Sequence, residues 1–220
     1  MTDLSPLPEK PASLLQKYMD EIELFNDAYG LVKVQNRQEL YVKHILDSLV
    51  PLEILIQNMP DTECSIADIG SGAGLPGIPL AICLPELTEQ ACEASKFTLI
   101  ERMGRRAGFL RNCVSVLGLS NVCVEEADFE KAKPERFDIA VFRALKPIEP
   151  VFLKKVIKLL KPGGFLAAWK GRYNKALEEM QAVKKSIPDL KWEIIPLKVP
   201  SMEEERHLTL IWPYSSCSSK

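Results

Sequence analysis

From Pro60 onward, short apolar runs alternate with segments of helical periodicity, and this alternation limits the chain to few folds. The apolar runs predict strands, and the helical segments between them end near proline or glycine. Nearly continuous apolar strands are typical of a parallel sheet covered on both faces. The predicted strands are 65–69, 97–100, 122–125, 137–142 and 164–169, with helices at 78–84, 104–117 and 149–160. The pattern therefore predicts an α/β fold, a doubly wound, mostly parallel sheet with right-handed crossovers.

Both ends of the chain depart from this alternation. Before the sheet, helical periodicity predicts one helix over 12–28 and another over 38–59, which Pro51 kinks or splits. After a helix at 174–186, two strand-like runs at 192–199 and 207–213 predict a hairpin with an antiparallel strand. We therefore expect an N-terminal helical extension (1–60), one α/β core (61–213) and a flexible tail (214–220).

Composition excludes several classes of protein. With 220 residues, 46% of them hydrophobic and 26% charged, the chain resembles a globular protein rather than a disordered or coiled-coil one. No apolar run reaches the roughly 18 residues of a membrane span, and acidic residues interrupt any N-terminal signal. A cytoplasmic protein without membrane contact is expected. The six cysteines form no Cys-x-x-Cys pair and there are two histidines, so we expect no metal site.

The charges are unevenly distributed although the net charge is only −2. Residues 1–100 carry 6 basic and 15 acidic side chains, whereas residues 131–185 carry 14 basic and 5 acidic ones. A solvated helix surface explains a single basic cluster equally well. The asymmetry as a whole indicates a face that attracts a polyanion.

A glycine-rich stretch, Ala-Asp-Ile-Gly-Ser-Gly-Ala-Gly-Leu-Pro-Gly-Ile-Pro at residues 67–79, follows the first predicted strand and opens a helix. Ligands bind at such turns because backbone N–H groups converge there. Glycines also allow a ligand to approach the main chain closely. A tight turn without a ligand is the alternative, but four glycines within eight residues favour a binding loop.

Acidic residues lie at the ends of the first three strands. Asp68 precedes Gly70 by two residues, Glu101 ends the second strand and Asp128 follows the third. These strand ends meet at one edge of a parallel sheet, where Glu101 is placed to bind a ribose diol. Three carboxylates suit a neutral or cationic nucleoside better than a pyrophosphate, which they would repel. A helix N-cap role is the alternative for each acid.

Several segments together resemble the small-subunit (16S) ribosomal RNA guanine-N7 methyltransferases, formerly called glucose-inhibited division protein B. The similarity extends over about residues 14–212. Besides the glycine loop, it is carried by His-Ile-Leu-Asp-Ser-Leu (44–49), Gly-Arg-Arg-Ala-Gly-Phe-Leu-Arg (104–111), Phe-Asp-Ile-Ala-Val-Phe-Arg-Ala-Leu (137–145), Trp-Lys-Gly (169–171) and Arg-His-Leu (206–208).

The resemblance implies a class I (Rossmann-like) methyltransferase with a seven-stranded sheet that binds S-adenosylmethionine. It would modify N7 of a guanine in 16S ribosomal RNA, in the 530 loop near the decoding centre, on the RNA or the small subunit. A monomer is expected. Glu101 and Asp128 depart from the acids common in this family by one methylene. The predicted cofactor-binding residues are Asp68, Gly70, Gly72, Leu75, Glu101, Ala127, Asp128 and Arg143.

Guanine N7 already carries an in-plane lone pair, so in-line methyl transfer needs no obligate general base. Arg143 is expected either to neutralise the cofactor carboxylate or to orient guanine O6. The predicted phosphate contacts are Arg105, Arg106, Lys170 and Arg172. Phe142 and Trp169 are candidates for base stacking or for the sheet core. The roles of His44 and Asp47 stay open.

Two other functions are compatible with the residues. Gly72, Gly74 and Gly77 satisfy the Gly-x-Gly-x-x-Gly pattern of nicotinamide-dependent oxidoreductases, and Glu101 follows Gly77 by 24 residues. That spacing does not exclude a dinucleotide. A non-catalytic RNA-binding or ribosome-assembly factor is the third hypothesis.

Overall fold

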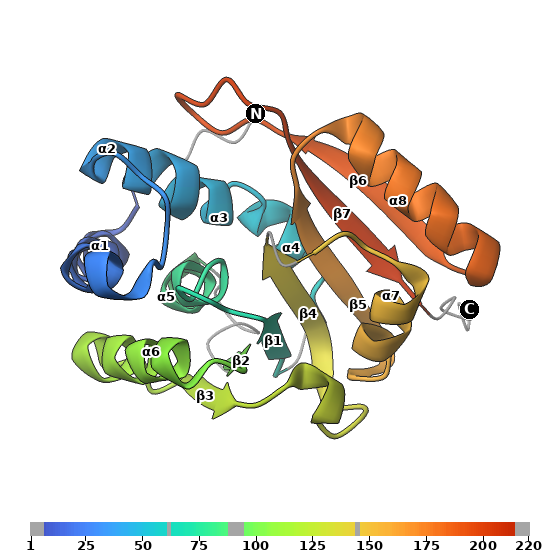
Figure 1. Cartoon of the computed structure of the whole chain (residues 1–220), viewed down its shortest axis with the longest axis horizontal. Coiled ribbons are helices and arrows are strands. Elements are labelled where there is room, and N and C mark those ends of the chain that lie inside the picture. Colours follow the sequence, from blue (N-terminus) through green and yellow to red (C-terminus); the bar gives the residue numbers. More distant parts are fainter. Residues whose placement is uncertain (1–6, 61–62, 88–94, 144–145, 214–220) are drawn as a thin grey trace.

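The computed structural model describes residues 7–60, 63–87, 95–143 and 146–213 (Figure 1). Helices cover both faces of a central seven-stranded sheet. The strands are β1 (Ser65–Ile69), β2 (Lys96–Glu101), β3 (Val122–Glu126), β4 (Phe137–Arg143), β5 (Leu160–Lys170), β6 (Lys191–Leu197) and β7 (Arg206–Trp212). The helices are α1 (Glu9–Tyr29), α2 (Arg37–Leu40), α3 (Asp47–Leu49), α4 (Leu52–Asn58), α5 (Gly77–Leu87), α6 (Gly104–Leu117), α7 (Pro150–Ile157) and α8 (Tyr173–Ser186), with a π-helix η1 (Tyr41–Leu46) and a 3₁₀ turn η2 (Phe129–Lys131).

The strand order is β3-β2-β1-β4-β5-β7-β6, and β7 runs antiparallel to both of its neighbours. The predicted doubly wound sheet and its antiparallel C-terminal strand are therefore confirmed. The order reverses direction between β1 and β4, which pair in parallel through Ile66–Asp68 and Ile139–Val141. At such a switch point the loops that follow the strands diverge and leave a crevice for ligands.

Alternate residues of each strand enter two separate hydrophobic cores. On β4, Ile139 and Val141 join the core beneath α1, α5 and α6, whereas Ala140 and Phe142 join the core beneath α7 and α8. Because side chains alternate along a strand, Arg143 continues the first set. The face of β4 that carries Arg143 is thus the one that the N-terminal helices cover.

The N-terminal segment departs from the prediction in one respect. α1 forms as expected, buries Leu15, Tyr18 and Ile22, and ends at Gly30, whose φ is +58°. The helical stretch predicted over 38–59 is present as α2, the π-helix, α3 and α4 in succession. Pro51 separates α3 from α4, as predicted. The π-helix widens the helical turn just before Asp47, and the spacing of apolar residues does not predict it.

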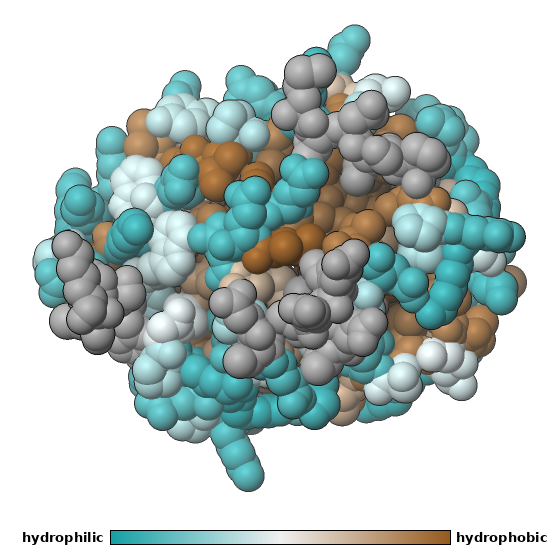
Figure 2. All heavy atoms as spheres, turned by 180° about the vertical axis from the view of Figure 1, so that it is seen from behind, coloured by the Kyte–Doolittle hydropathy of each residue, from teal (hydrophilic) through white to brown (hydrophobic). Residues whose placement is uncertain are grey.

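The face opposite to that of Figure 1 carries hydrophilic side chains around most of its margin, with hydrophobic atoms visible towards its middle (Figure 2). No helix in the described part of the chain is long and apolar enough to cross a membrane. The predicted tail, 214–220, and the last two residues of the segment 137–145 lie outside the described residues.

Candidate active site

The glycine loop folds tightly over Asp68. The Oδ2 of Asp68 accepts a hydrogen bond from the Gly77 N–H at 3.0 Å. A Cβ atom on Gly77 would lie 2.6 Å from that oxygen, so a larger residue cannot approach the carboxylate in this way. Gly74 has φ +93°, and a Cβ there would lie 2.5 Å from Ile78. The hydroxyl of Tyr18 on α1 donates to the Ala73 carbonyl at 2.6 Å and ties the loop to the N-terminal helix.

Asp68 is buried beneath this loop, with 1% of its surface exposed. Burial raises its pKa to about 7, although the hydrogen bond from Gly77 and the charge of Arg143 act in the opposite direction. Its Oδ1 has no hydrogen-bond partner among the residues that the structure describes. Asp68 lines neither of the cavities described below. It supports the loop from beneath, and direct contact with a cofactor stays a prediction.

A cavity of about 290 Å³ opens where β1, β2 and β3 end; we call it the Glu101 cavity. Four of the predicted cofactor residues line it: Gly70, Glu101, Ala127 and Asp128. Its other lining residues are Ile100, Arg102, Met103, Arg106, Phe129, Glu130 and Lys146. The fold thus brings together residues that lie up to 76 positions apart in the sequence, from Gly70 to Lys146.

Backbone N–H groups fix the carboxylate of Glu101, which is 5% exposed. Its Oε2 accepts from the Gly72 N–H at 2.9 Å and its Oε1 from the Met103 N–H at 2.8 Å. Each oxygen retains a further acceptor site, because an ionised carboxylate offers about four. Asp128 caps η2 by accepting from the Glu130 N–H at 3.1 Å, so its N-cap role is present.

Two predicted cofactor residues lie away from the wall of this cavity. Gly72 contacts the Glu101 carboxylate through its N–H. Leu75 is 5% exposed and belongs to the hydrophobic core. Within the described residues, both shape the loop rather than line either cavity.

A second cavity of about 550 Å³ lies beside the ends of β4 and β5; we call it the Arg143 cavity. Six basic residues line it against two acidic ones, so it is strongly cationic. Lys146 lines both cavities, which places them next to each other. The lining residues are Lys33, Lys43, His44, Asp47, Phe142, Arg143, Lys146, Pro147, Trp169, Lys170, Gly171, Glu179 and Arg206.

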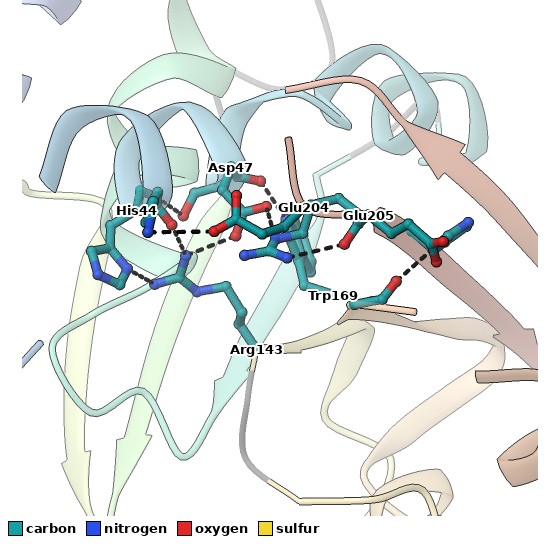
Figure 3. Close-up of polar contacts among 11 residues, drawn as sticks. His44, Asp47, Arg143, Trp169, Glu204 and Glu205 are labelled. Atoms are coloured by element: carbon teal, nitrogen blue, oxygen red, sulfur yellow. Dashed lines mark hydrogen bonds and ion pairs between the residues drawn. The ribbon is translucent and has the colours of Figure 1, made fainter. Parts of the chain in front are cut away.

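Arg143 is bound by one stretch of the N-terminal helices (Figure 3). Its Nη1 donates to the Lys43 carbonyl at 3.0 Å and to Asp47 Oδ2 at 2.9 Å. Its Nη2 lies 2.7 Å from Nδ1 of His44. Arg143 lines this cavity and not the adjoining Glu101 cavity, and its predicted contact with the cofactor stays a prediction.

The protonation of His44 follows from this contact. A guanidinium only donates, so the Nδ1 of His44 accepts and its proton is on Nε2. Burial and the nearby Arg143 charge lower the pKa of His44 to about 4, which keeps the imidazole neutral at neutral pH. The Nε2 atom has no partner among the described residues.

The residues predicted to contact phosphate differ in how far their side chains are exposed to solvent. Arg105 is exposed, with its guanidinium over the Tyr29 ring at 5.6 Å, and Arg172 is exposed at the start of α8. Arg106 lines the Glu101 cavity. The Lys170 side chain lines the Arg143 cavity, is only 12% exposed and has its Nζ 2.5 Å from Glu179, so its predicted contact with RNA stays a prediction.

Both candidate stacking residues belong to the core. Phe142 is 1% exposed and packs edge-on against Phe152, with ring centroids 5.4 Å apart. Trp169 is 3% exposed and donates from Nε1 to the Asp47 carbonyl at 2.8 Å. Their core alternative is therefore correct.

Three cavity residues escaped the prediction. Arg206 belongs to the segment Arg-His-Leu (206–208), which resembles the family but for which the sequence predicted no role. Lys146 lies within the basic stretch 131–185, and Lys43 precedes His44. The signal that identifies Arg206 is its place at the start of the antiparallel strand, because that end of β7 adjoins the ends of β4 and β5.

Comparison with known proteins agrees with this arrangement. The chain matches the family described as rRNA small subunit methyltransferase G over residues 12–209. It is 36% identical to Ribosomal RNA small subunit methyltransferase G of Treponema denticola, covering 92% of this chain and 86% of that protein. It is 35% identical to the protein of the same name from Actinobacillus pleuropneumoniae, covering 93% and 91%.

Solved structures show the same fold at low identity. A SAM dependent methyltransferase from Aquifex aeolicus has a TM-score of 0.56 and 15% identity over 91% of this chain and 97% of its own. P. horikoshii TYW2, solved in complex with MeSAdo, has a TM-score of 0.52 and 13% identity over 74% and 62%. The likeness confirms the Rossmann-like methyltransferase fold. Together with the match along nearly the whole sequence, it shows that this chain belongs to the rRNA small subunit methyltransferase G family.

Proposed function

We propose that this protein transfers a methyl group from S-adenosylmethionine to N7 of a guanine in 16S ribosomal RNA, in the 530 loop by family resemblance. The observation that carries the proposal is the pair of adjacent cavities at one edge of the sheet. The Glu101 cavity offers carboxylates beside a glycine loop. The Arg143 cavity offers cationic groups to an RNA. The proposed place of action is the cytoplasm, on the RNA or on the small subunit, with the protein as a monomer.

The residues of the Glu101 cavity fit an S-adenosylmethionine molecule. Glu101 is held rigidly by two backbone N–H groups and retains acceptor sites for the two hydroxyls of a ribose. Gly70 leaves the main chain open at the bottom of the cavity, and Ala127 and Asp128 offer a small wall and a carboxylate for the adenine. The buried Oδ1 of Asp68, which has no partner within the described part of the chain, lies beneath the same loop. These carboxylates also suit the positive charges of the cofactor.

In this proposal the chain supplies alignment and exclusion of water. S-adenosylmethionine, when bound, supplies a methyl group that its positively charged sulfur activates. Holding two reactants in line is worth about 7–11 kcal/mol relative to the free bimolecular reaction. No residue has to remove a proton, because guanine N7 presents a lone pair. Arg143, whose guanidinium is held in place, orients the base from the adjoining cavity.

The RNA is proposed to enter through the Arg143 cavity with its target base unpaired, because N7 lies in the deep, narrow groove of an A-form helix. The cationic side chains of Lys43, Lys146 and Arg206 line this cavity and are proposed to meet the phosphates at its rim. Arg105 and Arg172 extend the cationic surface on either side.

The proposal is tested with tritiated S-adenosylmethionine and small ribosomal subunits from cells that lack the protein. We expect one methyl group per subunit, at a guanine N7, and mapping of the methylated nucleotide identifies the site. Calorimetry with S-adenosylmethionine and with NADH separates the alternatives. Binding of NADH alone supports an oxidoreductase, and RNA binding without methyl transfer supports an assembly factor. Either result overturns the proposal.

A further inference from the structure

Asp47 links three elements that are far apart in the sequence. It begins α3 and is 3% exposed. Its Oδ2 accepts from Nη1 of Arg143 on β4 at 2.9 Å, and its Oδ1 accepts from Nε of Arg206 on β7 at 3.1 Å (Figure 3). Its backbone carbonyl accepts from Nε1 of Trp169 on β5 at 2.8 Å. One carboxylate thus holds an arginine from each side of β5.

The two guanidinium groups need this carboxylate. Arg143 and Arg206 both line the Arg143 cavity, where Lys43 and Lys146 add further positive charge. Their side chains are only 12% and 25% exposed, so water screens their mutual repulsion weakly. Removing one partner of a buried ion pair leaves the other charge uncompensated. Without the charge of Asp47, both guanidiniums are expected to move away from their present positions.

The contacts of Arg143 leave part of its guanidinium available. Three of its five N–H bonds are taken by Lys43, Asp47 and His44. The Nε–H and one Nη2–H have no partner among the described residues. A guanidinium edge that only donates complements the O6 acceptor of guanine and opposes the amino group that adenine carries at the same position.

We propose that Asp47 is a positioning residue that fixes Arg143 and Arg206 so that the free donors of Arg143 select guanine in the Arg143 cavity. This inference rests on the proposed function. Asp47 lines the same cavity, but its two carboxylate oxygens bind arginines, and it acts through them. His44 assists by accepting from the second nitrogen of Arg143, which prevents rotation of the guanidinium.

The test replaces Asp47 by Asn and by Glu in the full chain and measures three quantities. For Asp47→Asn we expect an unchanged Kd for S-adenosylmethionine, because the Glu101 cavity does not include this residue. We expect kcat on unmodified small subunits to fall about 100-fold, as for a misplacement of about 1 Å. The KM for subunits should change less than kcat, because Lys43, Lys146, Arg105 and Arg172 keep their positive charges in this variant. Asp47→Glu retains the charge and moves both arginines by one methylene, so kcat should fall about tenfold.

Asp138→Asn is the matched control. Asp138 is an ion-paired aspartate at the start of β4, at the opposite end of that strand from Arg143, where it binds the Ser65 N–H and Lys161, each at 2.8 Å. This variant should lose stability and retain kcat.

Each outcome decides between the claims. Wild-type kcat in folded Asp47→Asn overturns the inference, as does a kcat loss of equal size in Asp138→Asn. If Asp47→Asn does not fold, Asp47→Glu alone decides, and wild-type kcat there refutes the positioning role. If the unmutated protein neither binds S-adenosylmethionine nor methylates subunits, the proposed function itself has failed, which the wild-type reactions reveal independently.

Discussion

Asp68→Asn should change how the stability of the protein depends on pH. Burial raises the pKa of Asp68 from 3.8 to about 7 in the folded chain. A carboxyl whose folded pKa is raised contributes stability below its unfolded pKa and loses that contribution as pH rises to its folded pKa. The shift of about 3 units corresponds to about 4 kcal/mol at full ionisation, of which roughly 2–3 kcal/mol fall between pH 5 and pH 8. Asparagine can still accept from the Gly77 N–H and has no charge to bury.

The measurement is urea unfolding of both proteins without cofactor at pH 5 and pH 8. We expect Asp68→Asn to gain roughly 2–3 kcal/mol relative to wild type between these pH values. The pH dependence of stability is compared between the two proteins because the ionisation of His44 changes stability with pH in the opposite direction. Its pKa, lowered from 6.5 to about 4, means that its contribution is lost as pH falls through that range. Both proteins share this term, so it cancels. If the difference in unfolding free energy between the variant and wild type is the same at pH 5 and at pH 8, the pKa of Asp68 is not raised in the folded protein.

Three further perturbations test the loop and the cationic cavity. Gly77→Ala places a Cβ 2.6 Å from the Asp68 carboxylate and should cost about 1–3 kcal/mol of stability, measured by the urea midpoint. Gly108→Ala, whose site within α6 is open, is the control and should stabilise by about 0.5–1 kcal/mol. Tyr18→Phe removes the donor to the buried Ala73 carbonyl and should destabilise by about 1–3 kcal/mol, and a neutral effect would mean that the hydrogen bond is dispensable. Raising salt from 50 to 200 mM should weaken binding of small subunits by at least about tenfold and leave the Kd for S-adenosylmethionine unchanged, as binding assays at both salts will show.

The sheet was predictable because its strands are apolar runs bounded by glycine, proline or charge. β1 occupies 65–69 as predicted, and the other strands differ mostly by one or two residues. β5 begins four residues early, at Leu160, where the register beside Phe137 is irregular. Strand-end residues such as Glu101 and Asp128 were also predictable, since parallel strands bring their carboxyl ends to one edge.

The Arg143 cavity was not predictable in the same way. Its central contacts join Asp47 to Arg143 across 96 residues and to Arg206 across 159, and no local pattern reports such distances. The π-helix that precedes Asp47 likewise has no signature in the apolar spacing. Lys170 resembles any basic residue at a strand end, and only the neighbouring helix shows that Glu179 already neutralises it.

The ion pairs that Asp47 forms with Arg143 and Arg206 have a consequence for the order in which the structure is completed during synthesis. The three residues are translated in the order Asp47, Arg143 and Arg206, so Arg206 is available only after the other two. Until β7 has been made, Asp47 can pair with Arg143 but not with Arg206. Both ion pairs are therefore possible only once β7 has paired with β5, so the cluster is completed together with the sheet.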